Sequence, residues 1–136
     1  MHRRLFLATA LASLALPASA QTGWIDYTPG LVAERLAAGE TVFLDTAADW
    51  CTTCASQERT INAFMSENPD YAENVTFIRL DWDEFRRSQI VSDLNIPRRS
   101  TLVVLRGNQE LGRIVAGTRR ADIKALMDTA LAAAVS

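Results

Sequence analysis

Two cysteines three positions apart are the residues of this chain best suited to chemistry. Cys51 and Cys54 follow an apolar run, Val42–Leu44, and precede a stretch in which apolar residues recur at helical spacing. This order predicts a strand, a short loop and a helix that begins at Cys51. A thiol at a helix N-terminus is stabilised as the thiolate by the helix dipole and by unpaired backbone N–H groups. We therefore predict that Cys51 is a low-pKa nucleophile and that Cys54, one turn later, can form a disulfide with it.

Other uses of the cysteine pair remain open. A structural disulfide across so short a loop would stabilise the fold only weakly. A structural zinc site needs four Cys or His ligands, whereas the sequence beyond residue 20 holds two cysteines and no histidine. A two-thiolate Cu(I) site, a cluster shared between two chains, and a redox-inactive interaction module are the further alternatives. We expect redox exchange, with no metal and no cofactor beyond the Cys51–Cys54 disulfide.

The first 20 residues are typical of an export signal. They comprise a basic start at residues 2–4, an apolar segment over residues 5–16 that is too short to span a bilayer, and an Ala-x-Ala cleavage site at residues 18–20. Cleavage after Ala20 would leave residues 21–136, a length that supports one domain with one core. The sequence therefore predicts a periplasmic protein, exported by either the general or the twin-arginine route.

The predicted mature chain is acidic. Without the two arginines of the signal it carries 12 basic and 16 acidic residues, which gives a net charge of −4. This balance argues against nucleic acid or an anionic membrane surface as the main partner. No second apolar run is long enough for membrane insertion. Both cysteines lie in one motif, so we expect no separate disulfide framework.

The rest of the sequence predicts an α/β domain with a central mixed β-sheet flanked by α-helices. Thr28 and Thr118 are expected to cap the first and last helices. Strands are expected at Trp24–Tyr27, Thr41–Asp45, Val75–Trp82, Thr101–Leu105 and Leu111–Val115, and helices between Thr28 and Gly39, from Cys51 to about Ser66, from Phe85 to near Asn95, and from Thr118 through Leu131.

This order of elements, with Trp50-Cys51-x-x-Cys54 opening the second helix, resembles the thioredoxin fold over essentially all of the mature chain. The segment Ala48–Cys54 is most similar to periplasmic thioredoxin-like proteins, including the C-terminal domain of the electron-transfer reductase DsbD. The resemblance implies a thiol-disulfide oxidoreductase that reduces protein disulfides, with a thiol oxidant of the same fold as the alternative. A periplasmic reductase cannot meet cytosolic reductants, so a membrane electron donor of the DsbD or CcdA type is also implied.

The resemblance assigns roles to two charged residues. Asp45, six residues before Cys51, falls where thioredoxins keep a buried acid beneath the disulfide. Desolvation at the end of a buried strand should raise the pKa of its carboxyl group, which could then exchange the proton of Cys54. Arg79 falls where thioredoxins often carry a lysine, and we expect it to hold Asp45 charged. Ordinary solvated positions are the alternative for both residues.

Ser100 marks a departure from the thioredoxin pattern. Thioredoxins carry a cis-proline immediately before the strand that begins here at Thr101. Pro97 lies three residues too early, because its use would place Arg98 and Arg99 inside a buried strand. We therefore expect Ser100 at the cis-proline position. A non-proline cis bond costs about 2.5–4 kcal/mol, so the bond before Ser100 is open to either the cis or the trans form.

Residues near the cysteines are expected to meet the substrate. Trp50 is predicted to limit access to the first cysteine, and the loop at Ser100 and Thr101 to hold a substrate chain. Arg98 and Arg99 would stabilise the thiolate or attract acidic partners, with an ordinary solvated basic pair as the alternative. The partners predicted in this way are proteins that carry disulfides or dithiols.

Overall fold

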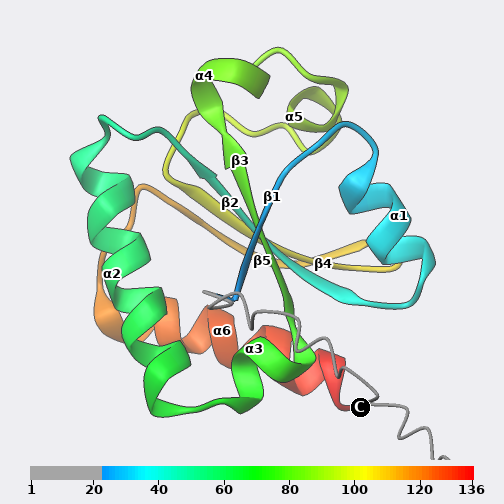
Figure 1. The fold of residues 1–136 in the computed structure, drawn as a ribbon, viewed down its shortest axis with the longest axis vertical. Coiled ribbons are helices and arrows are strands. Elements are labelled where there is room, and N and C mark those ends of the chain that lie inside the picture. The colour runs from blue at the N-terminus through cyan, green and yellow to red at the C-terminus, as the bar shows by residue number, and fades with distance from the viewer. Residues whose placement is uncertain (1–22) are drawn as a thin grey trace, which may run out of the picture.

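The computed structural model describes residues 23–136, which form a five-stranded mixed sheet with helices on both faces (Figure 1). The predicted signal sequence and its cleavage site lie outside the described residues. In chain order the elements are β1 (Trp24–Asp26), α1 (Leu31–Ala37), β2 (Thr41–Ala47), α2 (Thr52–Glu67), α3 (Asp70–Asn74), β3 (Thr76–Asp81), α4 (Trp82–Phe85), α5 (Gln89–Asp93), β4 (Thr101–Arg106), β5 (Gln109–Val115) and α6 (Arg120–Ala134). The strand order is β1-β3-β2-β4-β5.

Strand β2 occupies the middle of this sheet. It pairs in parallel with β3 and antiparallel with β4, so that Thr46 lies between Leu80 on one side and Thr101 on the other. All seven residues of β2 are buried, because neighbouring strands cover its edges and helices cover its faces. The buried strand β2 therefore fixes the position from which the chain enters α2.

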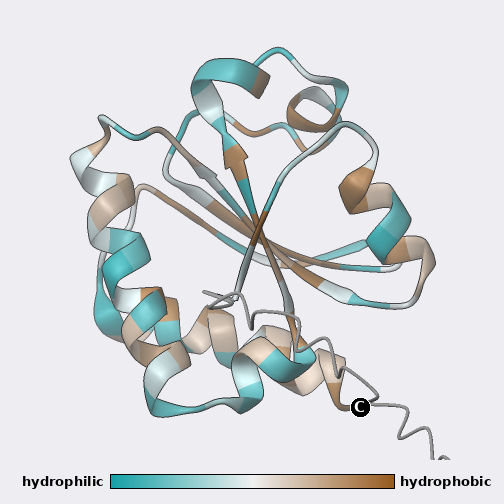
Figure 2. Cartoon of the chain, viewed as in Figure 1, coloured by the Kyte–Doolittle hydropathy of each residue, from teal (hydrophilic) through white to brown (hydrophobic). Residues whose placement is uncertain are grey.

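Alternate residues of β2 enter different core layers, as the two-residue period of a strand requires. Phe43 packs with Ile61 of α2 and Met127 of α6 on one face of the sheet. Val42 and Leu44 belong to the cluster on the other face, which α1 and α5 cover. Figure 2 shows hydrophobic colour along the crossing strands and hydrophilic colour on much of the helices and loops.

The predicted helix caps are wrong at two places. Helix α1 has Gly30, and not Thr28, as its N-cap, because the chain enters the helix through a left-handed conformation with φ of 87° that glycine adopts easily. Thr28 contributes only its backbone carbonyl, which accepts from the N–H of Leu31 at 3.0 Å. Helix α6 has Arg119 as its N-cap in place of Thr118, and no side chain caps it.

The helix expected from Phe85 to near Asn95 is wrong in its first part, because Phe85 ends the short helix α4 and the second helix, α5, begins only at Gln89. Trp82, expected as the end of a strand, is the first residue of α4. The carboxylate of Asp81 accepts from the N–H of Asp83 at 3.1 Å and caps α4. Ser88 then returns to an extended conformation, with ψ of 157°, before α5 begins. Phe85 of α4 packs in the same apolar cluster as Ile90 and Val91 of α5, and this shared packing produced the spacing that resembled one helix. Helix α3 was not predicted. It begins at Asp70, directly after Asn68 and Pro69, and this Asn-Pro-Asp sequence is typical of a chain that leaves a helix.

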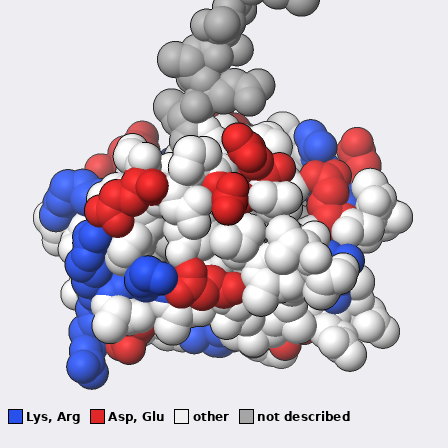
Figure 3. All heavy atoms as spheres, turned by 90° about the horizontal axis from the view of Figure 1, so that it is seen from below, with Lys and Arg blue, Asp and Glu red and all other residues white. Residues whose placement is uncertain are grey.

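Charged side chains of both signs share the surface shown in Figure 3, and neither sign covers that face. Within the described residues, no helix combines the length and the apolar character needed to cross a bilayer. Residues 23–136 also contain no group of three or more His, Cys, Asp or Glu side chains placed to hold a metal ion.

Candidate active site

The two cysteines lie where the central strand passes into α2. Cys51 is the N-cap of α2, with φ of −84° and ψ of 110°, and its sulfur accepts from the backbone N–H of Cys54 at 3.1 Å. The two sulfurs are joined in a disulfide, with the Cα atoms 5.3 Å apart. Only 4% of Cys51 and 1% of Cys54 is exposed. The Cys51 sulfur thus lies at the positive end of the helix dipole, where a thiolate is favoured over a thiol.

The hydroxyl of Ser100 lies against both sulfurs. Its Oγ is 3.2 Å from the Sγ of Cys51 and 3.1 Å from the Sγ of Cys54. Ser100 is fully buried and has a left-handed backbone, with φ of 65°. No peptide bond in residues 23–136 is cis, so the bond before Ser100 is trans. Ser100 therefore occupies the position opposite the disulfide but meets it with a polar group.

The backbone of Ser100 is held from three directions. Its N–H donates to the carbonyl of Thr46 at 2.7 Å, and its own carbonyl accepts from the N–H of Ala116 at 2.8 Å. The side-chain amide of Gln57 donates to the same carbonyl at 3.0 Å and to the carbonyl of Gly117 at 2.9 Å. A residue fixed by the central strand, by α2 and by the segment after β5 has little freedom to leave the sulfurs.

Thr101 is also buried, and its polar groups are satisfied inside the protein. Its hydroxyl donates to the carbonyl of Arg98 at 2.7 Å. The hydroxyl of Thr46 donates to the Thr101 carbonyl at 3.0 Å and accepts from the Thr101 N–H at 3.2 Å. Arg98 and Arg99 of the same loop are half-buried. The predicted substrate contacts of Ser100 and Thr101 stay predictions.

Asp45 lies within β2 and is fully buried. Neither of its carboxyl oxygens has a hydrogen-bond partner among the residues that the structure describes. Burial raises the pKa of this carboxyl group well above its ordinary value of 3.8, and the neighbouring Glu58 carboxyl raises it further. Arg79 acts in the opposite direction and has the smallest effect of the three. Asp45 therefore retains a proton at a pH where an exposed carboxyl has lost it.

Arg79 pairs with two acids other than Asp45. Its Nε lies 2.8 Å from the carboxylate of Glu58, and its terminal nitrogen lies 3.1 Å from the carboxylate of Asp49. Asp49 is almost fully exposed, so its ion pair is screened by solvent. Arg79 thus influences the pKa of Asp45 through its charge, without a hydrogen bond to the Asp45 carboxyl group.

Trp50 projects beside the disulfide and is 60% exposed. Its indole N–H donates to the carboxylate of Asp83 at 2.9 Å, and the guanidinium of Arg99 lies 4.4 Å from its ring centroid. Arg98 donates through Nε to the carbonyl of Arg99 at 3.0 Å. The loop before β4 and the residue before Cys51 are therefore joined by a cation–π contact next to the sulfurs.

Comparison with known proteins adds to this geometry. A family model described as Thioredoxin matches residues 31–129, a span that includes both cysteines, Asp45 and Ser100. The chain belongs to the thioredoxin family. It is a thioredoxin-like redox protein with a Cys51–Cys54 pair, which is consistent with a thiol-disulfide oxidoreductase.

Individual relatives agree with this membership. Thioredoxin H5 of Oryza sativa subsp. japonica is 29% identical over 97 residues, and the match spans 71% of this chain and 64% of the rice protein, less than two thirds of its length. Trxlp from Edwardsiella tarda has a TM-score of 0.64 at 24% identity, over 76% of this chain and 97% of its own. Thioredoxin from Malassezia sympodialis has a TM-score of 0.67 at 20% identity, over 79% and 93%. These structural likenesses confirm the predicted thioredoxin fold, and the narrower similarity to the DsbD C-terminal domain stays a prediction.

Three buried or half-buried residues of this thioredoxin site were not predicted. Gln57 and Glu58 follow Cys54 by three and four positions, on the helix face that carries Cys54, and Thr46 precedes the loop to Cys51. A polar residue on the buried face of a helix is unusual, and Gln57 carried that signal. One atom of this amide, Oε1, is buried without a partner in the described chain. The hydrogen-bond partners of Thr46, Gln57 and Glu58 are distant in the sequence, so the spacing of residues along α2 could not identify these three residues as part of the site.

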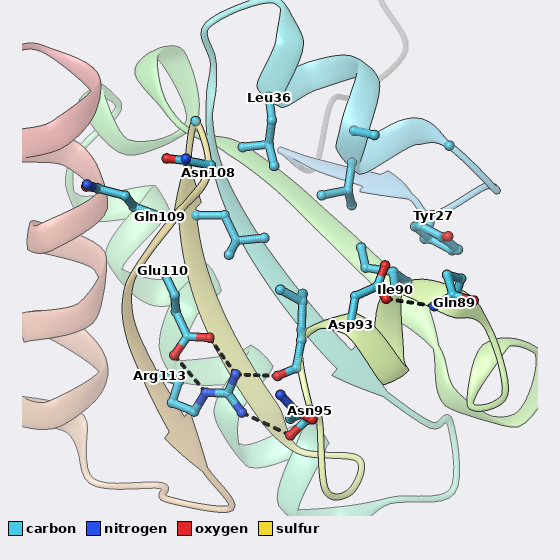
Figure 4. Close-up of a pocket in the computed structure, with 16 residues that line it drawn as sticks. Tyr27, Leu36, Gln89, Ile90, Asp93, Asn95, Asn108, Gln109, Glu110 and Arg113 are labelled. Atoms are coloured by element: carbon cyan, nitrogen blue, oxygen red, sulfur yellow. Dashed lines mark hydrogen bonds and ion pairs between the residues drawn. The ribbon is translucent and has the colours of Figure 1, made fainter.

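A separate cavity of about 980 Å³ lies between α1, α5 and the β4–β5 hairpin of this thioredoxin-family chain (Figure 4). None of the predicted site residues lines it. Leu36 and Ile90 contribute to its apolar wall. At its rim, Arg113 pairs with Glu110 and donates to the backbone carbonyls of Leu94 at 2.6 Å and Asn95 at 3.3 Å. The cavity and the cysteine site are thus built from different residues.

Proposed function

We propose that this protein is an exported thiol-disulfide oxidoreductase that reduces disulfides of periplasmic proteins. The observation that carries the proposal is the position of Cys51 at the N-cap of α2, where it is joined to Cys54 in a disulfide. The helix dipole and the Cys54 N–H favour a Cys51 thiolate in the reduced protein. Such a thiolate is the nucleophile that disulfide exchange needs.

The proposed exchange has two steps. The Cys51 thiolate attacks one sulfur of a substrate disulfide, so that a mixed disulfide forms and the other substrate sulfur leaves as a thiolate. Cys54 then attacks the Cys51 sulfur, closes the Cys51–Cys54 disulfide and releases the second substrate thiolate. The substrate gains two electrons and the cysteine pair loses two. The 5.3 Å separation of the two Cα atoms allows this second step without a large movement of the chain.

Asp45 supplies the proton acceptor for the second step. Cys54 is 1% exposed, so bulk solvent has little access to its thiol. The pKa of the Asp45 carboxyl group is raised by burial and by Glu58 toward the range in which it can both accept and return a proton. Asp45 takes the proton as Cys54 becomes the nucleophile, and it returns the proton when the pair is reduced again.

Substrate contacts are proposed on the exposed side of the disulfide. Trp50 is 60% exposed, and the guanidinium of Arg99, from the loop before β4, lies over its ring at 4.4 Å from the centroid. Ser100 and Thr101 fix that loop from inside. A protein chain that packs against the surface formed by Trp50 and Arg99 would bring its disulfide to Cys51.

The electron source is proposed from the expected compartment. Residues 1–20 predict export, and a reductase in the periplasm needs electrons delivered across the membrane. A membrane electron donor of the DsbD or CcdA type would reduce the Cys51–Cys54 disulfide after each turnover. The disulfide itself is the redox group, and the proposal requires neither a metal nor a further cofactor.

A thiol oxidant is the second candidate function. An oxidant needs its reduced form strongly stabilised, usually through a very low thiolate pKa. The contacts of the Ser100 hydroxyl with both sulfurs and the nearby Arg99 guanidinium favour this alternative. The Asp49 carboxylate opposes it, because negative charge disfavours a thiolate, and Asp45 opposes it only in its ionised form.

The reduction potential of the Cys51–Cys54 pair tests the proposal directly. Protein lacking residues 1–20 would be equilibrated with graded ratios of reduced and oxidised thiols, and the free cysteines counted after alkylation. We expect a value near that of thioredoxin, about −270 mV, as a reductase requires. A value near about −120 mV would assign the oxidant function instead, and a pair that never equilibrates would contradict both.

A further inference from the structure

The Ser100 hydroxyl has unusual surroundings for a buried donor. In the described part of the chain its only hydrogen-bond partners are the sulfurs of Cys51 and Cys54, at 3.2 Å and 3.1 Å. Sulfurs joined in a disulfide carry no hydrogen, so the hydroxyl is the donor in both contacts. A disulfide sulfur is a weak acceptor, whereas a thiolate is an anion that accepts strongly.

We propose that the Ser100 hydroxyl is a catalytic hydrogen-bond donor that follows the negative charge from Cys51 to Cys54 during exchange. The inference rests on the exchange reaction proposed above and assigns Ser100 a role beyond contact with the substrate chain. In the reduced protein the hydroxyl donates to the Cys51 thiolate. In the mixed disulfide Cys51 is bound to substrate, and the hydroxyl turns to the Cys54 sulfur as the charge develops there.

The nearly equal distances to the two sulfurs make this change of partner small. Rotation about one side-chain bond redirects the O–H, and Ser100 keeps its proton in every step. The backbone does not need to move, because Thr46, Gln57 and Ala116 hold it through hydrogen bonds of 2.7 to 3.0 Å. The left-handed φ of 65° sets the direction in which the side chain leaves the backbone.

The donor acts selectively on the reduced state. A hydrogen bond to a charged group is stronger than a hydrogen bond between neutral groups. The thiolate therefore gains more from Ser100 than the disulfide does. The consequence is a lower pKa for the Cys51 thiol and a cysteine pair that is easier to reduce than the same pair without the hydroxyl.

Ser100→Gly tests the proposal, because glycine accepts the left-handed backbone and lacks the hydroxyl. We expect the pKa of Cys51, followed by the pH dependence of alkylation, to rise by about one unit, a tenfold change in thiolate population. The equilibrium with glutathione is expected to shift about tenfold toward the disulfide, about 30 mV. Ser100→Ala keeps the Cβ atom and is expected to change both quantities in the same direction. Unchanged values in both variants would overturn the proposal.

Thr46→Val is the matched control. It removes a buried hydroxyl that anchors the same loop through Thr101 but that does not touch the sulfurs. We expect a lower urea midpoint with the Cys51 pKa changed less than twofold in thiolate population. A shift as large as that of Ser100→Gly would assign the effect to loop position and refute the role of the hydroxyl. The alkylation assay needs no protein partner, so it tests Ser100 even where the proposed reductase activity fails.

Discussion

The region around the disulfide and the cavity beside α1 differ in the polar side chains that they contain. Ala47, Ala48 and Trp82 pack against the cysteines, but the strand, helix and loop that hold the site also bury five polar side chains, those of Asp45, Thr46, Gln57, Ser100 and Thr101. Burial of a polar group costs free energy unless a hydrogen bond compensates it. Asp45 lacks such a partner entirely within the described chain, so its position is unfavourable for stability alone.

The cavity differs in its polar groups. Its wall combines aliphatic residues such as Leu36 and Ile90 with polar residues. Among the charged ones, Arg113 and Glu110 pair with each other, and Asp93 accepts a hydrogen bond from Gln89. Each of these three charged groups therefore has a polar partner. The presence of a large cavity therefore does not identify the reactive region of this protein. A concentration of buried polar groups, one of them an unpaired acid, marks it better.

Replacement of the cysteines should give the largest contrast between the two regions. Cys51→Ser is expected to abolish reduction of a model disulfide, because the nucleophile is gone. Cys54→Ser is expected to accumulate mixed disulfides, since nothing resolves them. Both are measured with an insulin reduction assay and by non-reducing gels. Ile90→Ala in the cavity wall should retain the exchange activity, and equal activity in the two cysteine variants would contradict the assigned order of attack.

Loss of the Asp45 carboxyl group should have the next largest effect. Asp45→Asn is expected to slow resolution of the mixed disulfide roughly 100-fold, the usual range for loss of a general base. The rate would be followed by stopped-flow release of a chromogenic thiol. Asp93→Asn, at the cavity rim, is the matched control. An unchanged resolution rate in Asp45→Asn would remove Asp45 from the mechanism.

The same variant should alter the dependence of stability on pH. The folded-state pKa of Asp45 is raised, so its protonated form contributes stability that is fully present below the ordinary value of 3.8 and is lost as pH rises through the folded-state pKa. The loss is about 1.4 kcal/mol for each pH unit within that window. Urea denaturation across pH should therefore show a flatter curve, and higher stability at neutral pH, for Asp45→Asn.

Ser100→Pro should destabilise the loop of the active site. Proline fixes φ near −65°, whereas Ser100 has φ of 65°, and proline has no N–H for the carbonyl of Thr46. We expect the free energy of unfolding to fall by roughly 3 kcal/mol in urea denaturation. Pro97→Ser changes the proline content of the same loop and should alter stability by less than about 1 kcal/mol. Equal stability of Ser100→Pro and the parent would disprove the left-handed conformation.

The smallest redox effect is expected from the cavity. Leu36→Ala removes apolar contact from the half-buried wall and should lower the free energy of unfolding by about 1–2 kcal/mol. The reduction potential of the cysteine pair should stay unchanged, because Leu36 touches none of the groups around the sulfurs. A shift in potential after this substitution would show that the two regions are coupled and would break the comparison.

Much of the fold could be predicted from local patterns. The apolar run Val42–Leu44 and the β-branched segment Thr101–Leu105 identified the two central strands, because a buried strand must be apolar on both faces. The helix caps could not be predicted in the same way. The chain enters α1 through the left-handed Gly30, a backbone choice that competes with the Thr28 side chain. Apolar spacing also could not reveal the break at Ser88.

The site was predictable only in part, for a related physical reason. The spacing of Cys51 and Cys54 predicted the redox pair, and the position of Ser100 directly before a strand predicted its place opposite that pair. Its contact with the sulfurs depends on a left-handed backbone and on bonds to Thr46 and Gln57, which are distant in the sequence. Glu58, which raises the pKa of Asp45, is likewise brought close only by the tertiary fold.

The burial of both sulfurs has a consequence for selectivity among attacking molecules. Only 4% of Cys51 is exposed, and the residue before it, Trp50, is in contact with Arg99 of the loop before β4. Oxidants and free thiols that approach from solution meet little of the sulfur surface, and susceptibility to damage follows exposure. A partner protein that binds to Trp50 and the loop before β4 can supply the missing access through its own binding energy. The site is therefore expected to exchange faster with matched proteins than with small thiols of equal reducing power.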